Sequence, residues 1–179
     1  HRYVFPIFDG KNQIIGFTGR DLLKNKSIDP KFTRPKYKHF TGGGSKGEWK
    51  WPLFLNHKVI KNLKKVILVE SPGDVLSFWT SGIKNVICLF GVELSNPLLN
   101  TLIKLDVNEI IISTNNDALN NNGSKTAGIE AAAKIQSKLC NWFDESAVSI
   151  ELPKEGKDWN EVLMLEGGRE IIKEWYKNL

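Results

Sequence analysis

The stretch Lys65-Val-Ile-Leu-Val-Glu70-Ser-Pro-Gly-Asp74 decides the fold. Its first five residues are a short apolar run, the pattern of a β-strand that is buried on both faces of a parallel sheet. Residues 73–81 then follow a helical pattern, so the stretch predicts a strand, a turn and a helix. The turn carries two carboxylates, Glu70 and Asp74, just beyond the end of the predicted strand.

The same alternation continues to the end of the chain. Further apolar runs predict strands at 85–90, 109–113 and 147–152, and the segments after them predict helices at 95–105, 125–142, 158–165 and 168–177. Strands and helices that alternate at this spacing form right-handed crossovers, which make the strands parallel and place helices on both faces. The fold class is therefore α/β, with a parallel sheet flanked by helices.

A different pattern precedes this sheet. Residues 3–8 and 13–18 predict two strands joined by a hairpin turn, and 48–55 alternates weakly, as a third strand would. The Lys-, Pro- and Gly-rich residues 24–50 predict an exposed loop. We therefore expect a small basic β-rich subdomain at 1–64, the parallel-sheet domain at 65–165 and a C-terminal helix at 166–179.

Charge divides the chain at the same place. Residues 1–64 hold 14 Lys and Arg against 4 Asp and Glu, a net charge of +10, while residues 65–179 hold 11 against 16, a net charge of −5. A basic region beside an acidic one predicts a surface for a polyanion next to a site that holds carboxylates. Taken alone, the basic region fits a solvated lysine-rich surface equally well.

Cysteine content and hydropathy exclude several classes of protein. The two cysteines, Cys88 and Cys140, are too few for a disulfide framework or a cysteine-based zinc site, so we expect no zinc in this chain. No apolar run approaches the roughly 20 residues that a membrane helix needs. We therefore expect a protein of the reducing cytoplasm with no membrane partner.

Acidic side chains follow three of the four predicted strands. Glu70 ends the first strand, Asp117 follows the third and Asp158 follows the fourth. Because chemistry in parallel sheets gathers at the carboxyl ends of the strands, we expect these three acids on one rim. Carboxylates held together need a cation, and oxygen ligands suit Mg²⁺ or Mn²⁺. The alternative for Asp158, which precedes a predicted helix, is a helix cap.

These motifs resemble the TOPRIM domain, the metal-binding fold of bacterial-type primases, type IA and II topoisomerases and some nucleases. Glu70-Ser-Pro-Gly-Asp74 resembles its first motif, a strand-end glutamate with a second acid four residues on. Asn115-Asn116-Asp117 stands where the family has Asp-x-Asp, and Gly91 resembles the glycine turn after the second strand. The resemblance implies a TOPRIM sheet over residues 65–165.

Segments on both sides of these motifs narrow the resemblance to DnaG-type primases. Arg2–Ile7, Gly16–Arg20 and Pro35–Tyr37 resemble, in order, the basic subdomain that precedes TOPRIM in those enzymes. Gly156–Asn160 resembles their acidic motif after the sheet, so the resemblance spans most of the chain. The polar loop and short format are similar to a phage-type primase, which would place the protein in a bacterial cell or a phage-infected host.

The resemblance implies a DNA-dependent RNA primase core that makes primers on single-stranded DNA during replication. The implied reaction is attack of a 3′-hydroxyl on the α-phosphate of an NTP, with Mg²⁺ or Mn²⁺, two ions in all, holding both groups. The implied partners are the single-stranded DNA template, the RNA primer and NTPs. A replicative helicase and a zinc-binding domain are expected on flanking sequence or in trans.

The resemblance also assigns roles to individual residues. Its catalytic residues are Glu70, Asp74 and Asp117, and its metal ligands are Glu70, Asn115, Asp117 and Asp158. The residues that it implies for binding nucleic acid or NTP are Arg2, Arg20, Arg34, Lys36, Tyr37 and Lys157.

Two positions depart from the family pattern. Asn115 replaces the first aspartate of Asp-x-Asp, and Asn160 stands where a second downstream acid is usual. An amide oxygen can ligate a metal but adds no charge, so each exchange is expected to weaken metal affinity and to favour Mn²⁺. Two alternatives stay open: a metal-dependent TOPRIM nuclease, against which the basic subdomain argues, and a non-catalytic nucleic-acid-binding module.

Aromatic residues before the sheet leave a further choice. Trp49 and Trp51 alternate beside Lys46 and Lys50, as aromatics that stack on single-stranded bases would. The alternative is that at least one of them packs in the core. His39, which follows Pro35-Lys36-Tyr37, is a minor candidate for contact with nucleic acid.

Overall fold

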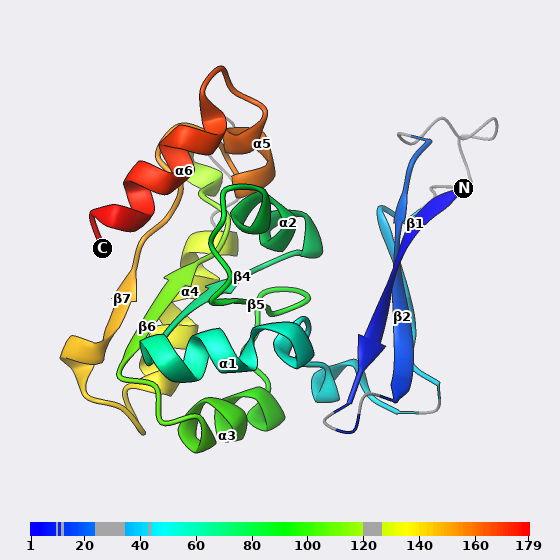
Figure 1. Ribbon diagram of the computed structural model, residues 1–179, viewed down its shortest axis with the longest axis horizontal. Coiled ribbons are helices and arrows are strands. Elements are labelled where there is room, and N and C mark those ends of the chain that lie inside the picture. Colours follow the sequence, from blue (N-terminus) through cyan, green and yellow to red (C-terminus); the bar gives the residue numbers. More distant parts are fainter. Residues whose placement is uncertain (10, 12, 24–34, 43, 120–126) are drawn as a thin grey trace.

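Two sheets of opposite kind organise the chain in the computed structural model (Figure 1). A three-stranded antiparallel sheet in the order β1-β2-β3 comes first, and a four-stranded parallel sheet in the order β5-β4-β6-β7 follows. The structure describes the whole chain except residues 10, 12, 24–34, 43 and 120–126. The α/β class, with a small β-rich part before a parallel sheet, is confirmed.

The parallel sheet contains the four predicted strands: β4 (Lys65–Val69), β5 (Val86–Cys88), β6 (Glu109–Ser113) and β7 (Val148–Ile150). β4 and β6 lie side by side, with Val69 opposite Ser113. The residues that follow each strand therefore emerge next to each other, which brings the turn at Glu70 beside the turn at Asn115–Asp117. This register positions the candidate site.

Alternate residues of the strands face two separate apolar clusters, as the two-residue period of a strand requires. Ile67 and Val69 share one cluster with α2 (Pro72–Thr80), α5 (Trp159–Leu163) and α6 (Gly168–Lys177). Val66 and Leu68 share the other with α1 (Leu53–Leu63), α3 (Asn96–Lys104) and α4 (Ala127–Leu139). Burying each such side chain stabilises the fold by about 1.5–3 kcal/mol, so both faces of the sheet contribute to stability.

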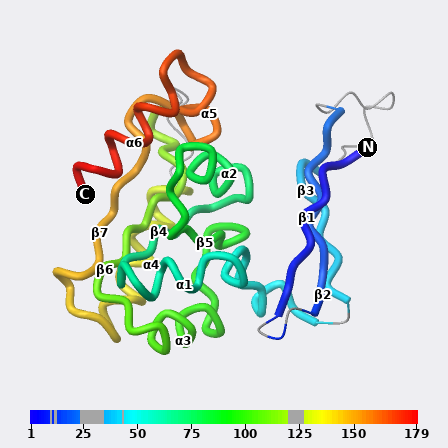
Figure 2. Tube along the Cα trace, in the orientation of Figure 1, coloured from blue at the N-terminus to red at the C-terminus, as the bar shows by residue number. Residues whose placement is uncertain are grey.

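The antiparallel sheet consists of β1 (Arg2–Phe8), β2 (Ile14–Asp21) and β3 (Tyr37–Phe40), with β2 in the middle, and Figure 2 traces the three strands. The predicted hairpin of the first two strands is confirmed. The third strand lies at 37–40, inside the segment that was predicted to be a loop, because β2 supplies its hydrogen-bonding partners. Residues 24–34 of that predicted loop lie outside the described residues.

The predicted strand at 48–55 is wrong. A short 3₁₀-helix, η1 (Lys46–Glu48), and the first turn of α1 occupy this stretch instead. Pro52 has no N–H to give to a ladder and stands at the N-cap of α1, where a missing donor costs nothing. The helix that follows, α1, has no counterpart in the sequence-based assignment.

Trp49 and Trp51 join the two sheets. They are only 3% and 6% exposed, and both belong to the cluster that contains Ile7 of β1 and Val69 of β4. The Phe5 and Trp51 rings lie 5.6 Å apart in an edge-to-face arrangement, and the Trp51 carbonyl accepts from the Cys88 N–H at 2.9 Å. The interpretation as core residues is therefore confirmed, and stacking of these indoles on bases is excluded by their burial.

The remaining elements follow the sequence closely, with two short 3₁₀-helices, η2 (Asp117–Leu119) and η3 (Glu145–Ala147), added between them. Within the described ranges, no helix has the length and apolar character that crossing a membrane requires.

Candidate active site

Glu70 and the main-chain N–H of Asn115 lie at the rim formed by the carboxyl ends of β4 and β6. The Glu70 side chain is half-buried, and the Asn115 N–H lies close enough to favour its charged form. Burial raises the pKa of Glu70, and the nearby Asp117 carboxylate raises it further, while the Asn115 N–H and the ammonium groups of Lys157 and Lys36 lower it. Glu70 is thus a carboxylate close to a second negative charge and to two cations.

Asp117 is held in a fixed orientation. Its Oδ2 accepts from the Gly128 N–H at 2.7 Å, in the first turn of α4, and its Oδ1 lies 3.2 Å from the Lys157 ammonium. The neighbouring Asn116 ties this turn to the segment after β7, because its N–H donates to the Lys157 carbonyl and its amide to the Pro153 carbonyl, both at 2.8 Å. The sequence-predicted residues Asp117 and Lys157 are therefore in direct contact.

Asp74 lies at a different depth. It is 1% exposed, and its Oδ2 accepts from both the N–H and the hydroxyl of Ser71, which makes a capping box at the start of α2. Its Oδ1 accepts from the Trp159 N–H at 3.1 Å, so it also fixes the start of α5. Burial, with the nearby Asp158 charge second, raises the pKa of Asp74 to about 6.

Asp158 caps α5. Its Oδ1 accepts from the Glu161 N–H at 2.8 Å, as the helix-cap alternative predicts. It also lies close enough to Asp74 to raise the pKa of that buried acid. The acids of the rim are thus arranged as two pairs, Glu70 with Asp117 and Asp74 with Asp158. In the part of the chain that the structure describes, no three His, Cys, Asp or Glu side chains are grouped as a metal site.

The first pair fits one hard divalent cation by its chemistry. Glu70 and Asp117 offer carboxylate oxygens as ligands, and a bound cation would relieve the repulsion between their charges. The Lys157 ammonium already neutralises part of that charge. The main-chain N–H of Asn115 favours the charged form of Glu70, and the side-chain amide of Asn115 is neutral. Asp74 is less suited to a metal, because both its oxygens already serve backbone donors.

The basic antiparallel sheet reaches this rim through Arg20, Tyr37 and Lys36. Arg20 Nη1 donates to the Tyr37 hydroxyl at 3.2 Å, and the guanidinium lies 5.3 Å from the centre of the Tyr37 ring. A Cβ built on Gly73 would lie 3.7 Å from that hydroxyl and 3.9 Å from Asn160 Cβ. Tyr37 therefore faces the start of α2, just after Glu70, and Lys36 is close enough to act on the Glu70 charge.

The other predicted cations are placed differently. Arg2 donates to the carbonyls of Gly19 at 2.9 Å and Pro35 at 3.1 Å and pairs with Asp21 at 3.6 Å, so it ties β1, β2 and the approach to β3 together. Arg34 lies outside the described residues, so its predicted contact with nucleic acid is not examined by the structure.

Lys46, which the sequence places beside Trp49 in a candidate stacking surface, lies at the rim instead. Its ammonium donates to the Phe90 carbonyl at 2.7 Å and lies 3.9 Å from a Cβ built on Gly91, whose N–H donates to the Glu70 carbonyl at 3.2 Å. The available signal was a lysine that ends a Gly-rich run just before Trp49. His39 lies nearby, with its ring 5.6 Å from Trp49 and 6.2 Å from Phe90, and burial lowers its pKa.

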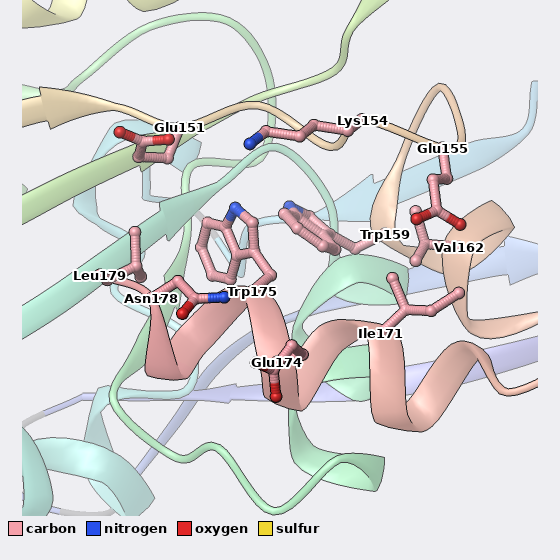
Figure 3. A pocket seen from close by; sticks show the side chains of 10 residues that line it. All are labelled: Glu151, Lys154, Glu155, Trp159, Val162, Ile171, Glu174, Trp175, Asn178 and Leu179. Atoms are coloured by element: carbon pink, nitrogen blue, oxygen red, sulfur yellow. The ribbon is translucent and has the colours of Figure 1, made fainter.

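A pocket of about 310 Å³ lies on another flank of the sheet, between the segment after β7 and α6 (Figure 3). Trp159 and Trp175 form its floor, and Lys154, Glu155 and Glu174 stand around it. Glu70, Asn115 and Asp117 do not line it, so the pocket is separate from the rim.

The fold and the rim together define a class of protein. Residues 67–163, more than half of the chain, match the Toprim-like family. The chain therefore belongs to the Toprim-like family, and the sequence-based expectation of this domain is confirmed.

DNA primases are the particular proteins that this chain resembles. It is 35% identical over 166 residues to the DNA primase of Borreliella burgdorferi, covering 93% of this chain and 28% of that one. The solved zinc-binding and RNA polymerase domains of the Aquifex aeolicus primase match 99% of this chain and 40% of that chain, with a TM-score of 0.73 and 27% identity. A DnaG primase catalytic domain solved with single-stranded DNA shares the fold, with a TM-score of 0.73, 22% identity, and coverage of 99% and 51%. The resemblance to DnaG-type primases is confirmed, and the chain spans only part of each relative.

Proposed function

We propose that this chain forms the nucleotidyl-transfer centre of a DNA primase. It would extend an RNA primer from NTPs on a single-stranded DNA template, in the cytoplasm of a bacterium or of a phage-infected host. A replicative helicase and a zinc-binding domain would act beside it. The relatives support this proposal, since curated proteins that match 93% of the chain are DNA primases.

One observation carries the proposal: a basic sheet meets the acidic strand ends at a single place. The Tyr37 hydroxyl, held by Arg20, faces Gly73, and Lys36 acts on the charge of Glu70. A polynucleotide phosphate bound by Arg20 and Lys36 would therefore lie next to the Glu70–Asp117 pair. Phosphate binding by Arg and Lys beside a carboxylate pair is the arrangement that phosphoryl transfer requires.

Glu70 and Asp117 have different roles in the proposed nucleotidyl transfer. In the reaction, the primer 3′-oxygen forms a bond to the α-phosphorus of an NTP, the bond to the leaving pyrophosphate breaks, and the 3′-hydroxyl loses its proton. Glu70, which is half-buried at the rim, is suited to accept that proton at one carboxylate oxygen. Asp117 and Glu70 would hold a divalent cation, which neutralises phosphate charge when it is bound.

Asp74 acts through structure in this proposal. It fixes the start of α2 through Ser71 and the start of α5 through Trp159, and so positions the turns that carry Glu70 and Asp158. A second ion would draw on Asp158, whose other oxygen is not required by the cap of α5. Lys157 and Arg20 would complete the contacts with phosphate.

Primer extension tests the proposal directly. An end-labelled primer on a single-stranded template is incubated with NTPs and Mg²⁺ or Mn²⁺, beside Glu70→Gln and EDTA controls. We expect longer products that vanish with EDTA and fall about a thousandfold in Glu70→Gln, the scale for losing a group worth several kcal/mol in the transition state. Metal-dependent shortening of the primer would instead support a nuclease.

A non-catalytic binding module is the second candidate, and the neutral amides of Asn115 and Asn160 favour it. Such a module would bind single-stranded DNA in a salt-sensitive way that EDTA leaves unchanged, because Lys and Arg supply the affinity. A clear gel shift without any extension, in either metal, would support the module over the primase.

A further inference from the structure

Lys157 contributes its charge to both members of the rim pair. Its ammonium is 3.2 Å from Asp117 Oδ1, and its charge also lowers the pKa of Glu70. The side chains of Asp117 and Lys157 are 10% and 34% exposed, so this ion pair is screened less than one on an open surface. Glu70, Asp117 and Lys157 together carry one net negative charge instead of two.

Two hydrogen bonds of its main chain fix the position of Lys157. Its carbonyl accepts from the Asn116 N–H at 2.8 Å, in the turn that carries Asp117. Its own N–H donates to Glu161 Oε2 at 2.9 Å, in the first turn of α5. The lysine is therefore part of a built contact between two strand-end turns.

Asp117 leaves one oxygen for exchange. Its Oδ2 is engaged by the Gly128 N–H at 2.7 Å, and this bond fixes the carboxylate plane. Its Oδ1, the oxygen that the Gly128 bond leaves over, is the oxygen that contacts Lys157, and the charge of this carboxylate acts on Glu70. A divalent cation bound by Asp117 and Glu70 would therefore compete with the Lys157 ammonium for Asp117 Oδ1. The two positive charges would repel each other if both stayed at that oxygen.

We propose that Lys157 is an exchangeable internal counter-cation: it neutralises the Glu70–Asp117 pair, and a divalent cation must displace it from Asp117 Oδ1. Lys157 thereby sets the metal affinity of the site. This inference rests on the metal site of the proposed function. Its consequence is stronger here because Asn115, at the other rim position, adds no negative charge to offset the lysine.

The test measures Mn²⁺ binding without any reaction. Titration followed by electron paramagnetic resonance of free Mn²⁺ gives the Kd of the wild type, Lys157→Gln, Lys157→Arg and Lys154→Gln. We expect Lys157→Gln to bind Mn²⁺ about tenfold more tightly, because one charge at about 4 Å is worth more than 1 kcal/mol at a partly shielded site. Lys157→Arg keeps the charge and should stay within about twofold of the wild type.

Lys154→Gln is the matched control, since it removes the same charge three residues earlier from an exposed position of the same segment. It should change the Kd by less than about twofold, as expected for a screened surface charge. Equal or weaker Mn²⁺ binding by folded Lys157→Gln, or equal tightening by Lys154→Gln, would overturn the proposal. If Lys157→Gln does not fold, a Lys157→Arg Kd far from that of the wild type would overturn it instead.

The outcomes separate this inference from the proposed function. Tighter Mn²⁺ binding by Lys157→Gln, together with no primer extension by the wild type, would keep the exchange and reject the primase. Primer extension by the wild type, together with an unchanged Mn²⁺ affinity in Lys157→Gln, would keep the primase and reject the exchange.

Discussion

The turns after β4 and β6 emerge side by side from the same sheet, but different contacts hold them. The turn after β4 is closed locally by the capping box between Ser71 and Asp74, and the N–H groups of Gly91 and Trp159 add hydrogen bonds to Glu70 and Asp74. The turn after β6 is held by distant partners, through Asn116 to Pro153 and through Asp117 to Gly128. In the turn after β4, Asp74 makes hydrogen bonds that stabilise the fold, and Glu70 lies at the rim.

This difference shows that an acid at a strand end is not by itself a ligand. Asp74 is the more deeply buried acid and carries the larger structural load, while Glu70, four residues earlier, keeps its carboxylate at the rim. In the turn after β6, the acid at the rim depends on a helix start and on a lysine from another segment. The first turn should therefore tolerate changes around it better than the second.

Two glycines give the sharpest test of this contrast. A Cβ on Gly128 would overlap the Asn115 carbonyl oxygen, whereas a Cβ on Gly73 would come no closer than 3.4 Å, to the Ser71 hydroxyl. We expect Gly128→Ala to lower the free energy of unfolding by about 3 kcal/mol, because main chain cannot yield easily. Gly73→Ala should stay within about 1 kcal/mol of the wild type. Urea unfolding measures both, and similar losses would refute the contrast.

The pH dependence of stability tests the buried acid of the first turn. The folded-state pKa of Asp74 is about 6 against an ordinary value of 3.8, so the folded state binds more protons between these values. Stability should therefore fall as the pH rises from about 4 to about 6, by up to about 3 kcal/mol from this group, and should then level off. Urea unfolding across this range measures the slope.

Asp74→Asn should remove most of that slope, because the group no longer titrates. Glu70→Gln should remove a smaller part, in the same direction, since the pKa of Glu70 is also raised but its side chain is only half-buried. A full slope in Asp74→Asn would show that other groups control the transition.

In the turn after β6, the aspartate that the family has at the position of Asn115 can be restored. Asn115→Asp adds a carboxylate beside Glu70 and Asp117, and we expect the Kd for Mn²⁺ to fall about tenfold, on the scale of one added charge at a partly shielded site. Asn160→Asp, at an exposed position, should have a smaller effect. Titration with Mn²⁺ measures both. Equal effects of the two variants would show that the β6 turn has no special part in holding the ion.

The smallest expected effect concerns the hydroxyl that faces the first turn. Tyr37→Phe removes the acceptor of Arg20 and should weaken single-stranded DNA binding about threefold, the scale of one hydrogen bond. Fluorescence anisotropy at fixed salt measures the change. Tyr176→Phe is the control, because its hydroxyl donates to Asn85 Oδ1 at 3.1 Å in a separate contact. That variant should leave DNA binding unchanged.

Much of the sheet was predictable from local pattern. The apolar run of β6 was assigned at its observed bounds, and α6 was too, because its period of apolar residues is strong. β3 was missed, since its four residues lie next to Pro35 and depend on β2 for their hydrogen bonds. α1 was missed because Trp49 and Trp51 alternate as strand residues do, although each packs into the core.

The rim was predictable only in part. Glu70 and Asp117 were both assigned to the strand ends, and parallel register brings them close. The structural use of Asp74 was not predictable, because its partner Trp159 is 85 residues away. The contact of Lys157 with Asp117 depends likewise on two turns that meet only in the folded chain.

The main-chain hydrogen bond from the Cys88 N–H to the Trp51 carbonyl has a practical consequence for anyone who divides this chain into fragments. β5 is an edge strand, and the carbonyl of Trp51 covers part of that edge, while Trp49 and Ile60 fill the clusters on its two sides. A fragment that starts at Lys65 would leave this edge bare and remove Ile7, Trp49, Trp51 and Ile60 from the core, which favours aggregation. Expression boundaries and chimaeras with relatives should therefore keep β1 together with residues 46–64, because Phe5 and Ile7 pack against the same cluster as Trp49 and Trp51.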